Sequence, residues 1–160
     1  MGTWGTGPFD NDAAGDLLDE LAECTPDERV APLRQLFAAV LRDPDADTYE
    51  VAFPTGYLDG LNADEVVAGA ALVALALPGG EQVLEVPMDR TFPGGGIPDL
   101  VASAGVPAPS HDLIALAAEA LRIATAPTRS WYQAWLDDGD RVLALGGVTA
   151  TLRVLDYAVR

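Results

Sequence analysis

The chain has 160 residues, nearly half of them hydrophobic, so it is long enough to bury a sizeable core and too apolar to be intrinsically disordered. Its formal net charge is −16 and all of its positive charges are arginines, which disfavours nucleic-acid binding through a basic surface. Its one cysteine, Cys24, excludes an intrachain disulfide and a thiolate metal cluster.

Residues 1–11 predict a non-helical strap. Three glycines and Pro8 disfavour a helix there, because glycine adds backbone freedom and proline lacks an N–H. Trp4 and Phe9 are the only large apolar side chains in this stretch, so their burial is the main means of holding it in place. We therefore expect the strap to pack on the helices that follow.

Two amphipathic helices should follow the strap. Asp10 or Asn11 would cap the first of them, and Asp12 would add a favourable negative charge at its positive end. Residues 25–28 form a capping-box sequence that opens the second helix. Pro32 lies inside the apolar pattern of that helix, which predicts a kink or a short turn before its main part.

The middle of the chain predicts a central helix flanked by ambiguous segments. Residues 62–65 give another helix start, and residues 66–77 are apolar on every face, as in a helix buried by others. Alternating apolar residues at 49–53 suit a short strand. The segment 81–97 is either irregular loop or, through residues 83–86, a second strand that pairs with 49–53.

Helical signals return in the last third of the chain. Residues 98–104 suit one or two helical turns, Ser110 is a cap for a helix that carries apolar residues as far as 123, and residues 145–159 suit a last amphipathic helix. The expected fold is therefore mainly α: one domain over residues 1–160, with about five or six helices around helix 66–77 and a two-stranded hairpin as an option.

Aromatic residues gather at the two ends of the chain. Trp131 and Trp135 are one turn apart and should share a helical face, with Gly139 as the helix stop. If the strap folds against that helix, Trp4 would join them. Such a tryptophan group is either ordinary core packing, the interpretation we favour, or a binding surface.

The opening residues 4–12, with the sequence WGTGPFDND, resemble the signature of an uncharacterised bacterial family, domain of unknown function 4259. A weaker likeness continues through residues 66–77, residues 111–123, Trp131 and Trp135. The long loops rich in proline and glycine on both sides of the central helix depart from the family pattern. The resemblance implies a mostly helical domain and supplies no reaction.

No catalytic pattern stands out in the sequence. Asp10 and Asp12 offer oxygen ligands of the kind that Mg²⁺ or Ca²⁺ prefers, but capping of a helix explains them without a metal. His111 is the only histidine, so any triad would depend on it, and a solvent-exposed or locally hydrogen-bonded ring is the simpler interpretation. Gly94–Gly96 lacks the flanking residues of a phosphate loop. We therefore assign no catalytic residue, metal or cofactor.

Two functions from different classes remain open. The first is a non-enzymatic acidic module that binds a basic protein, with an inhibitory or immunity-like role, in the cytoplasm of a bacterium and away from membranes and nucleic acid. The alternative is a small metabolite- or metal-binding domain, or an enzyme, with a pocket under the strap. A third interpretation is an oligomerisation module built on the last helix. The candidate binding residues are Trp4, Asp10, Asp12, Trp131 and Trp135.

Overall fold

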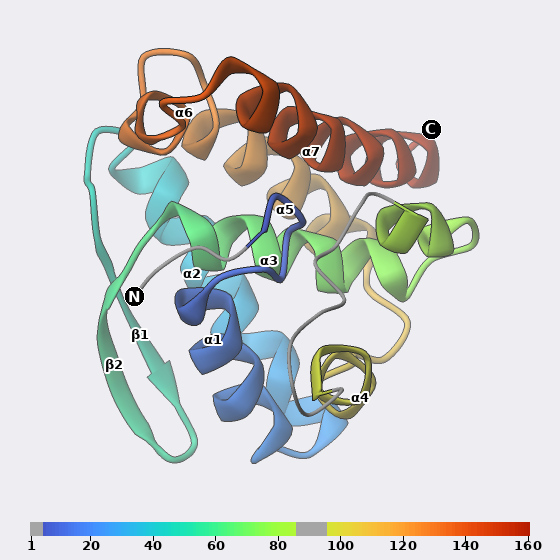
Figure 1. Cartoon of the computed structure of the whole chain (residues 1–160). Coiled ribbons are helices and arrows are strands. Elements are labelled where there is room, and N and C mark those ends of the chain that lie inside the picture. Colours follow the sequence, from blue (N-terminus) through green and yellow to red (C-terminus); the bar gives the residue numbers. More distant parts are fainter. Residues whose placement is uncertain (1–4, 86–95) are drawn as a thin grey trace.

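A computed structural model describes residues 5–85 and 96–160, and within these ranges the fold is mainly helical, as the sequence predicts (Figure 1). The α-helices are α1 (Asp12–Ala22), α2 (Val30–Arg42), α3 (Ala63–Leu75), α4 (Gly96–Ser103), α5 (His111–Ala124), α6 (Ser130–Ala134) and α7 (Asp138–Ala158). The 3-10 helices are η1 (Pro26–Arg29) and η2 (Gly80–Glu85), and the strands are β1 (Tyr49–Phe53) and β2 (Gly56–Leu61).

Helix α3 runs through the middle of the molecule, and every residue from Glu65 to Ala74 in it is buried. Helices α1 and α4 lie on one side of it, and α5 and α7 lie on the other (Figure 1). The predicted central helix is thus confirmed, although it begins at Ala63 and ends at Leu75. No helix in the described ranges is both long enough and apolar enough to cross a bilayer.

Side-chain caps fix the starts of the main helices. The Ala14 N–H donates to Asn11 Oδ1 over 2.7 Å, so Asn11 is the cap of α1. At α3 the Asn62 N–H donates to Glu65 Oε2 over 2.6 Å, as the capping-box pattern predicts. Each cap satisfies N–H groups that have no partner inside the helix, which is why these starts could be read from the sequence.

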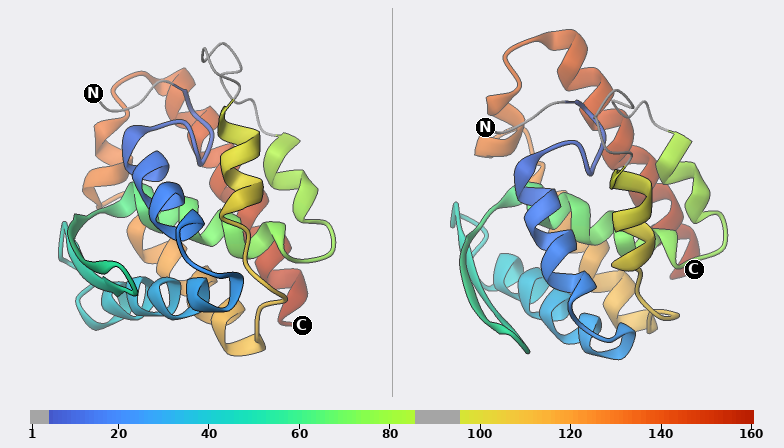
Figure 2. Two further views of the ribbon diagram at one scale, coloured as in Figure 1. Left: turned by 90° about the horizontal axis from the view of Figure 1, so that it is seen from below. Right: turned by 60° about the horizontal axis from the view of Figure 1, so that its bottom comes forward.

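Strands β1 and β2 form an antiparallel hairpin that lies beside α2 (Figure 2). The alternation predicted for 49–53 is confirmed, because Tyr49, Val51 and Phe53 are buried. Pairing of this segment with 83–86 is wrong for the residues that the structure describes: positions 83–85 belong to η2, and Val86 lies outside the described ranges. A strand that follows after a tight turn is a closer partner than one thirty residues away.

The region around the two C-terminal tryptophans differs from the prediction. Helix α6 ends at Ala134, and Trp135 is extended with φ −77° and ψ 95°, so the two tryptophans do not share a helical face. Gly139 is not a stop but lies in the first turn of α7. The reason is a helix cap that was not predicted from the sequence. The Asp140 N–H donates to Asp137 Oδ1 over 3.0 Å, so Asp137 is the N-cap of α7.

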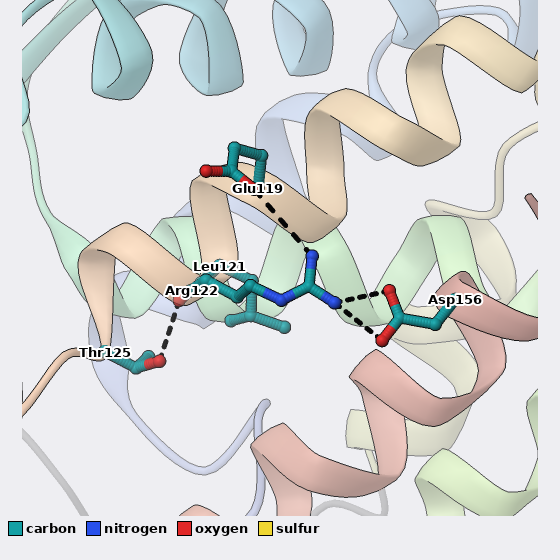
Figure 3. Close-up of polar contacts among 5 residues, drawn as sticks. All are labelled: Glu119, Leu121, Arg122, Thr125 and Asp156. Carbon is teal, nitrogen blue, oxygen red and sulfur yellow. Dashed lines mark hydrogen bonds and ion pairs between the residues drawn. The ribbon is translucent and has the colours of Figure 1, made fainter.

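An ion pair joins α5 to α7 at the surface (Figure 3). Arg122 Nη2 donates to both carboxylate oxygens of Asp156 over 2.5 and 2.6 Å, and its Nη1 lies 3.8 Å from Glu119 Oε2. All three side chains are more than a third exposed, so we assign this group to the docking of the two helices and expect it to contribute little to stability.

Gly80 follows α3 so closely that no side chain fits there. A Cβ at this position would lie 2.7 Å from Leu75 Cα and even closer to the Ala74 carbonyl oxygen, both in the backbone. We expect Gly80→Ala to lower the free energy of unfolding by about 1.5 kcal/mol, because backbone must shift to admit the methyl group. The matched control is Gly15→Ala in α1, where nothing lies within 4 Å.

That control should raise the free energy of unfolding by about 0.5 kcal/mol, because alanine is the better helix former. Urea denaturation of both variants measures the two changes in the free energy of unfolding. Equal effects of the two alanines would contradict the close approach at Gly80.

Candidate functional site

A cleft of about 800 Å³ lies between the strap, the first turn of α3, α6 and the start of α7. The residues that line it are Gly5, Thr6, Asp47, Asn62, Ala63, Asp64, Ser130, Trp131, Ala134, Trp135, Leu136, Asp137 and Asp140. Segments from both ends and the middle of the chain therefore meet at one hollow, which is large enough for a small organic ligand or for a side chain of a partner.

The strap forms one wall of the cleft by folding around Asp10. The Gly7 N–H donates to Asp10 Oδ2 over 3.0 Å, and the Asp10 side chain is only 1% exposed. A Cβ at Gly5 would lie 2.9 Å from Asp10 Cβ, so the closeness of strap and carboxylate requires glycine. Phe9 is fully buried, as predicted, and holds the strap against the core. Gly5 and Thr6 are thereby kept at the cleft.

Two indole rings form a second wall. Trp131 is 8% exposed, and its Nε1–H donates to Asp64 Oδ1 over 3.1 Å. Trp135 is half-buried and packs edge-on against it, with ring centroids 5.9 Å apart and planes at 71°. Edge-to-face packing of this kind is a favourable arrangement for aromatic rings. Trp131 therefore belongs to the core and the wall together, whereas Trp135 is the more accessible of the two.

Arg141 of α7 holds the end of α6 in place. Its Nη2 donates to the Trp135 carbonyl oxygen over 2.6 Å, and its Nη1 donates to Asp138 Oδ1 over 2.9 Å. The guanidinium group also lies over the ring of Tyr132, 5.1 Å from the centroid. Trp135 thus has a fixed position although it lies beyond the last turn of α6.

Four carboxylates face this hollow. Asp47, Asp64, Asp137 and Asp140 line the cleft, and no arginine, lysine or histidine of residues 5–85 and 96–160 lines it. Arg129, outside the lining, comes within 3.9 Å of Asp47. Burial raises the pKa of Asp64 above its usual value, and the hydrogen bond from the indole opposes that effect. The cleft is therefore a region of negative potential.

Glu65 lies directly beside the cleft but faces inward. Its side chain is buried, and desolvation raises its pKa to about 7, with hydrogen bonds from Asn62 and its own backbone N–H acting in the opposite direction. The charges of Asp64 and Asp16 raise this pKa further. Glu65 consequently titrates near neutral pH as part of the α3 cap, not as a lining group.

The structure places the predicted binding residues as follows. Trp131 and Trp135 come together in the cleft, whereas Trp4 lies outside the described residues. Asp10 is buried in the strap, and Asp12 is exposed in the first turn of α1, so neither lines the cleft. The cleft carboxylates were missed because three of the four belong to helix starts. Their common signal is an aspartate at or just after a cap.

Other candidate groups have ordinary structural roles. His111 is exposed, and its Nε2 lies 3.3 Å from the Val159 carbonyl oxygen. Cys24 is buried, its Sγ donates to the Glu20 carbonyl oxygen over 3.4 Å, and burial raises the pKa of the thiol. Within 5–85 and 96–160, no group of three or more His, Cys, Asp or Glu residues is arranged to hold a metal ion.

Comparisons with known proteins identify one family. The family model described as "Domain of unknown function (DUF4259)" matches residues 2–143. That span contains all the residues of the described part of the chain that line the cleft. No curated protein and no solved structure matched the chain.

Proposed function

Since the chain belongs to the DUF4259 family, whose description supplies no reaction, we propose a function from the cleft itself: a non-enzymatic acidic protein that binds a basic protein partner. The setting that we propose is the bacterial cytoplasm, and the role is inhibitory or immunity-like, with the partner's basic site covered while it is bound. The cleft is the part of the molecule that would accept the partner's positive group.

The observation that carries this proposal is the combination of four carboxylates with an indole wall, without a basic residue among those of the described ranges that line the cleft. An aspartate such as Asp64, which is desolvated by burial, gains more from a cation than a fully solvated one does, because the attraction is stronger where the dielectric is low. Indole faces attract cations through their negative π-electron clouds. Both kinds of wall thus favour positive charge.

The charge of the whole chain supports the same partner. A net charge of −16 attracts a basic protein over long distances, speeds the encounter and makes it sensitive to salt. Steering alone does not select a partner, because any basic surface would respond to it. The cleft adds the local contact that selectivity needs.

One alternative is favoured by the size of the cleft. A volume of about 800 Å³ lies within the usual range for small-molecule sites, so a free cationic metabolite is the second candidate. A competition experiment distinguishes the two candidates. A small amine or guanidine at millimolar concentration would displace a bound metabolite from the cleft. It would displace a protein partner only weakly, because the protein makes additional contacts.

The proposal is tested by affinity capture from a lysate of the organism that encodes the chain, with three baits. The first is the wild type, and the second carries Asp64→Asn, Asp137→Asn and Asp140→Asn in the cleft. The third removes the same number of charges from exposed positions elsewhere, through the substitutions Asp19→Asn, Glu23→Gln and Asp59→Asn.

We expect the wild type and the third bait to retain a basic protein at low salt and to release it at high salt. The cleft bait should not retain this protein at low salt. Asparagine keeps the cap at position 137, so the cleft bait should remain folded. Equal retention by the second and third baits would overturn the assignment of the partner to the cleft.

A further inference from the structure

We propose that the group bound in the cleft is the guanidinium of an arginine side chain presented by the partner protein. This inference rests on the proposed function and adds the chemical class of the contact. It is carried by the presence of Trp135, Asp64 and the aspartates at the start of α7 on the walls of one cleft.

A planar cation fits the indole wall better than a compact one. Trp135 is half-buried, and Trp131 on one side and the Arg141 hydrogen bond to its carbonyl oxygen on the other fix its position. Guanidinium is flat and weakly hydrated, so it stacks on an aromatic face with little loss of solvation, whereas an ammonium group is strongly hydrated. Arg141 lies over the Tyr132 ring in the same molecule, which is an example of this stacking.

The carboxylates suit a donor with several N–H groups. Asp64 Oδ1 accepts the indole N–H of Trp131, which orients the carboxylate, and within the part of the chain that the structure describes its second oxygen accepts no further hydrogen bond. Asp140 and Asp137 line the cleft from α7. Guanidinium has five N–H donors in a rigid plane, so it can donate hydrogen bonds to carboxylates on more than one wall of the cleft at once.

An anion is the opposite candidate, because the N-termini of α3 and α7 both reach the cleft. A helix N-terminus attracts negative charge through its unpaired N–H groups. Here the side chains of Asn62 and Asp137 already accept hydrogen bonds from the N–H groups of Asp64 and Asp140 over 2.8 and 3.0 Å. The carboxylates around them repel a further anion, which leaves a cation as the favoured ligand.

The test follows the indole N–H signals of ¹⁵N-labelled protein by NMR during titration. The probes are acetyl-Gly-Arg-Gly-amide, the same peptide with lysine, and the same peptide with citrulline, which has the shape of arginine without its charge. Inorganic phosphate is the anion probe, and free L-arginine amide tests a small metabolite.

We expect the arginine peptide to shift the Trp131 and Trp135 signals in a saturable manner. The lysine peptide should bind about three- to tenfold more weakly, because its ammonium group cannot stack flat on an indole ring and lacks the planar set of N–H donors of guanidinium. Citrulline and phosphate should give no saturable shift. Free arginine amide that binds more tightly than the peptide would overturn a protein-borne arginine in favour of a metabolite.

Two variants and one control locate the contact of the arginine peptide. Trp135→Phe and Asp64→Asn should each weaken the arginine peptide about fivefold or more. Tyr57→Ala, which removes an aromatic side chain that is 74% exposed on β2, is the matched control and should bind as the wild type does. Thermal melts show whether each variant is folded, and the phenylalanine and asparagine changes are conservative enough to keep the fold.

The outcomes separate this inference from the proposed function. The arginine and lysine peptides could bind equally well while the cleft bait alone still loses the basic protein in the capture experiment. That combination would overturn the guanidinium assignment and keep the acidic binding function. Loss of the capture result would overturn the proposed function whatever the peptides do. Full binding of the arginine peptide by both cleft variants would overturn the site itself.

Discussion

Replacement of Arg29 by methionine is expected to lower the free energy of unfolding by about 3 kcal/mol, since it removes charged hydrogen bonds from buried carbonyls. The Arg29 side chain is buried and donates to three backbone carbonyl oxygens: Nε to Leu21 over 2.7 Å, Nη2 to Cys24 over 2.9 Å and Nη1 to Gly105 over 2.6 Å. Two of these acceptors are at the end of α1, where helix carbonyls lack partners.

Methionine fills a similar volume and provides no donor, so the carbonyl oxygens of Cys24 and Gly105 would lose these hydrogen bonds, whereas the Leu21 carbonyl oxygen would keep the one from the Cys24 N–H. Urea denaturation at pH 7 measures the effect, and a fall in the melting temperature of about 10 °C should accompany it. Arg34→Met is the matched control, because Arg34 is exposed and donates to a side chain, Ser110 Oγ, over 3.3 Å. A change of less than 1 kcal/mol at Arg29 would contradict its role as a clamp between α1 and the loop after α4.

Glu65→Gln is expected to stabilise the protein at pH 8, by on the order of 2 to 3 kcal/mol, and to have little effect at pH 5. The folded state holds a proton on Glu65 up to a pKa of about 7, against the ordinary value of 4.5. Between these two values the folded state binds more protons than the unfolded state, so the wild type loses stability as the pH rises through this window.

Glutamine avoids this loss because it is neutral and still accepts the hydrogen bond from the Asn62 N–H. The measurement is the difference in free energy of unfolding between variant and wild type from pH 4.5 to 8.5. Glu119→Gln, at an exposed position of α5, is the matched control. A constant difference over the whole range would show that folding does not shift the pKa of Glu65.

The helices were predictable where local chemistry decides them. The start of α3 follows from the capping box of Asn62 and Glu65, and its burial follows from a run of residues that is apolar on every face. The start of α1 follows from a choice between Asp10 and Asn11, which the structure resolves in favour of Asn11. These features need no knowledge of distant residues.

The cleft was not predictable, because it depends on segments that meet only in the folded chain. Asp64 and Trp131 are hydrogen-bonded although 67 residues separate them, and nothing local to either indicates the other. The error at Gly139 had a local cause: glycine is a common helix stop, but the cap at Asp137 outweighs it. The aspartates that line the site were therefore not among the binding residues predicted from the sequence.

The Arg29 clamp sets an order of events during protein synthesis. Its Gly105 partner is made 76 residues later, a delay of about 4 to 15 seconds at usual elongation rates. Helices α2 and α3 likewise pack on α5, which emerges later still. During that interval the apolar faces of the first helices lack their final neighbours, which makes the nascent chain a client for chaperones at the ribosome until its last third has emerged.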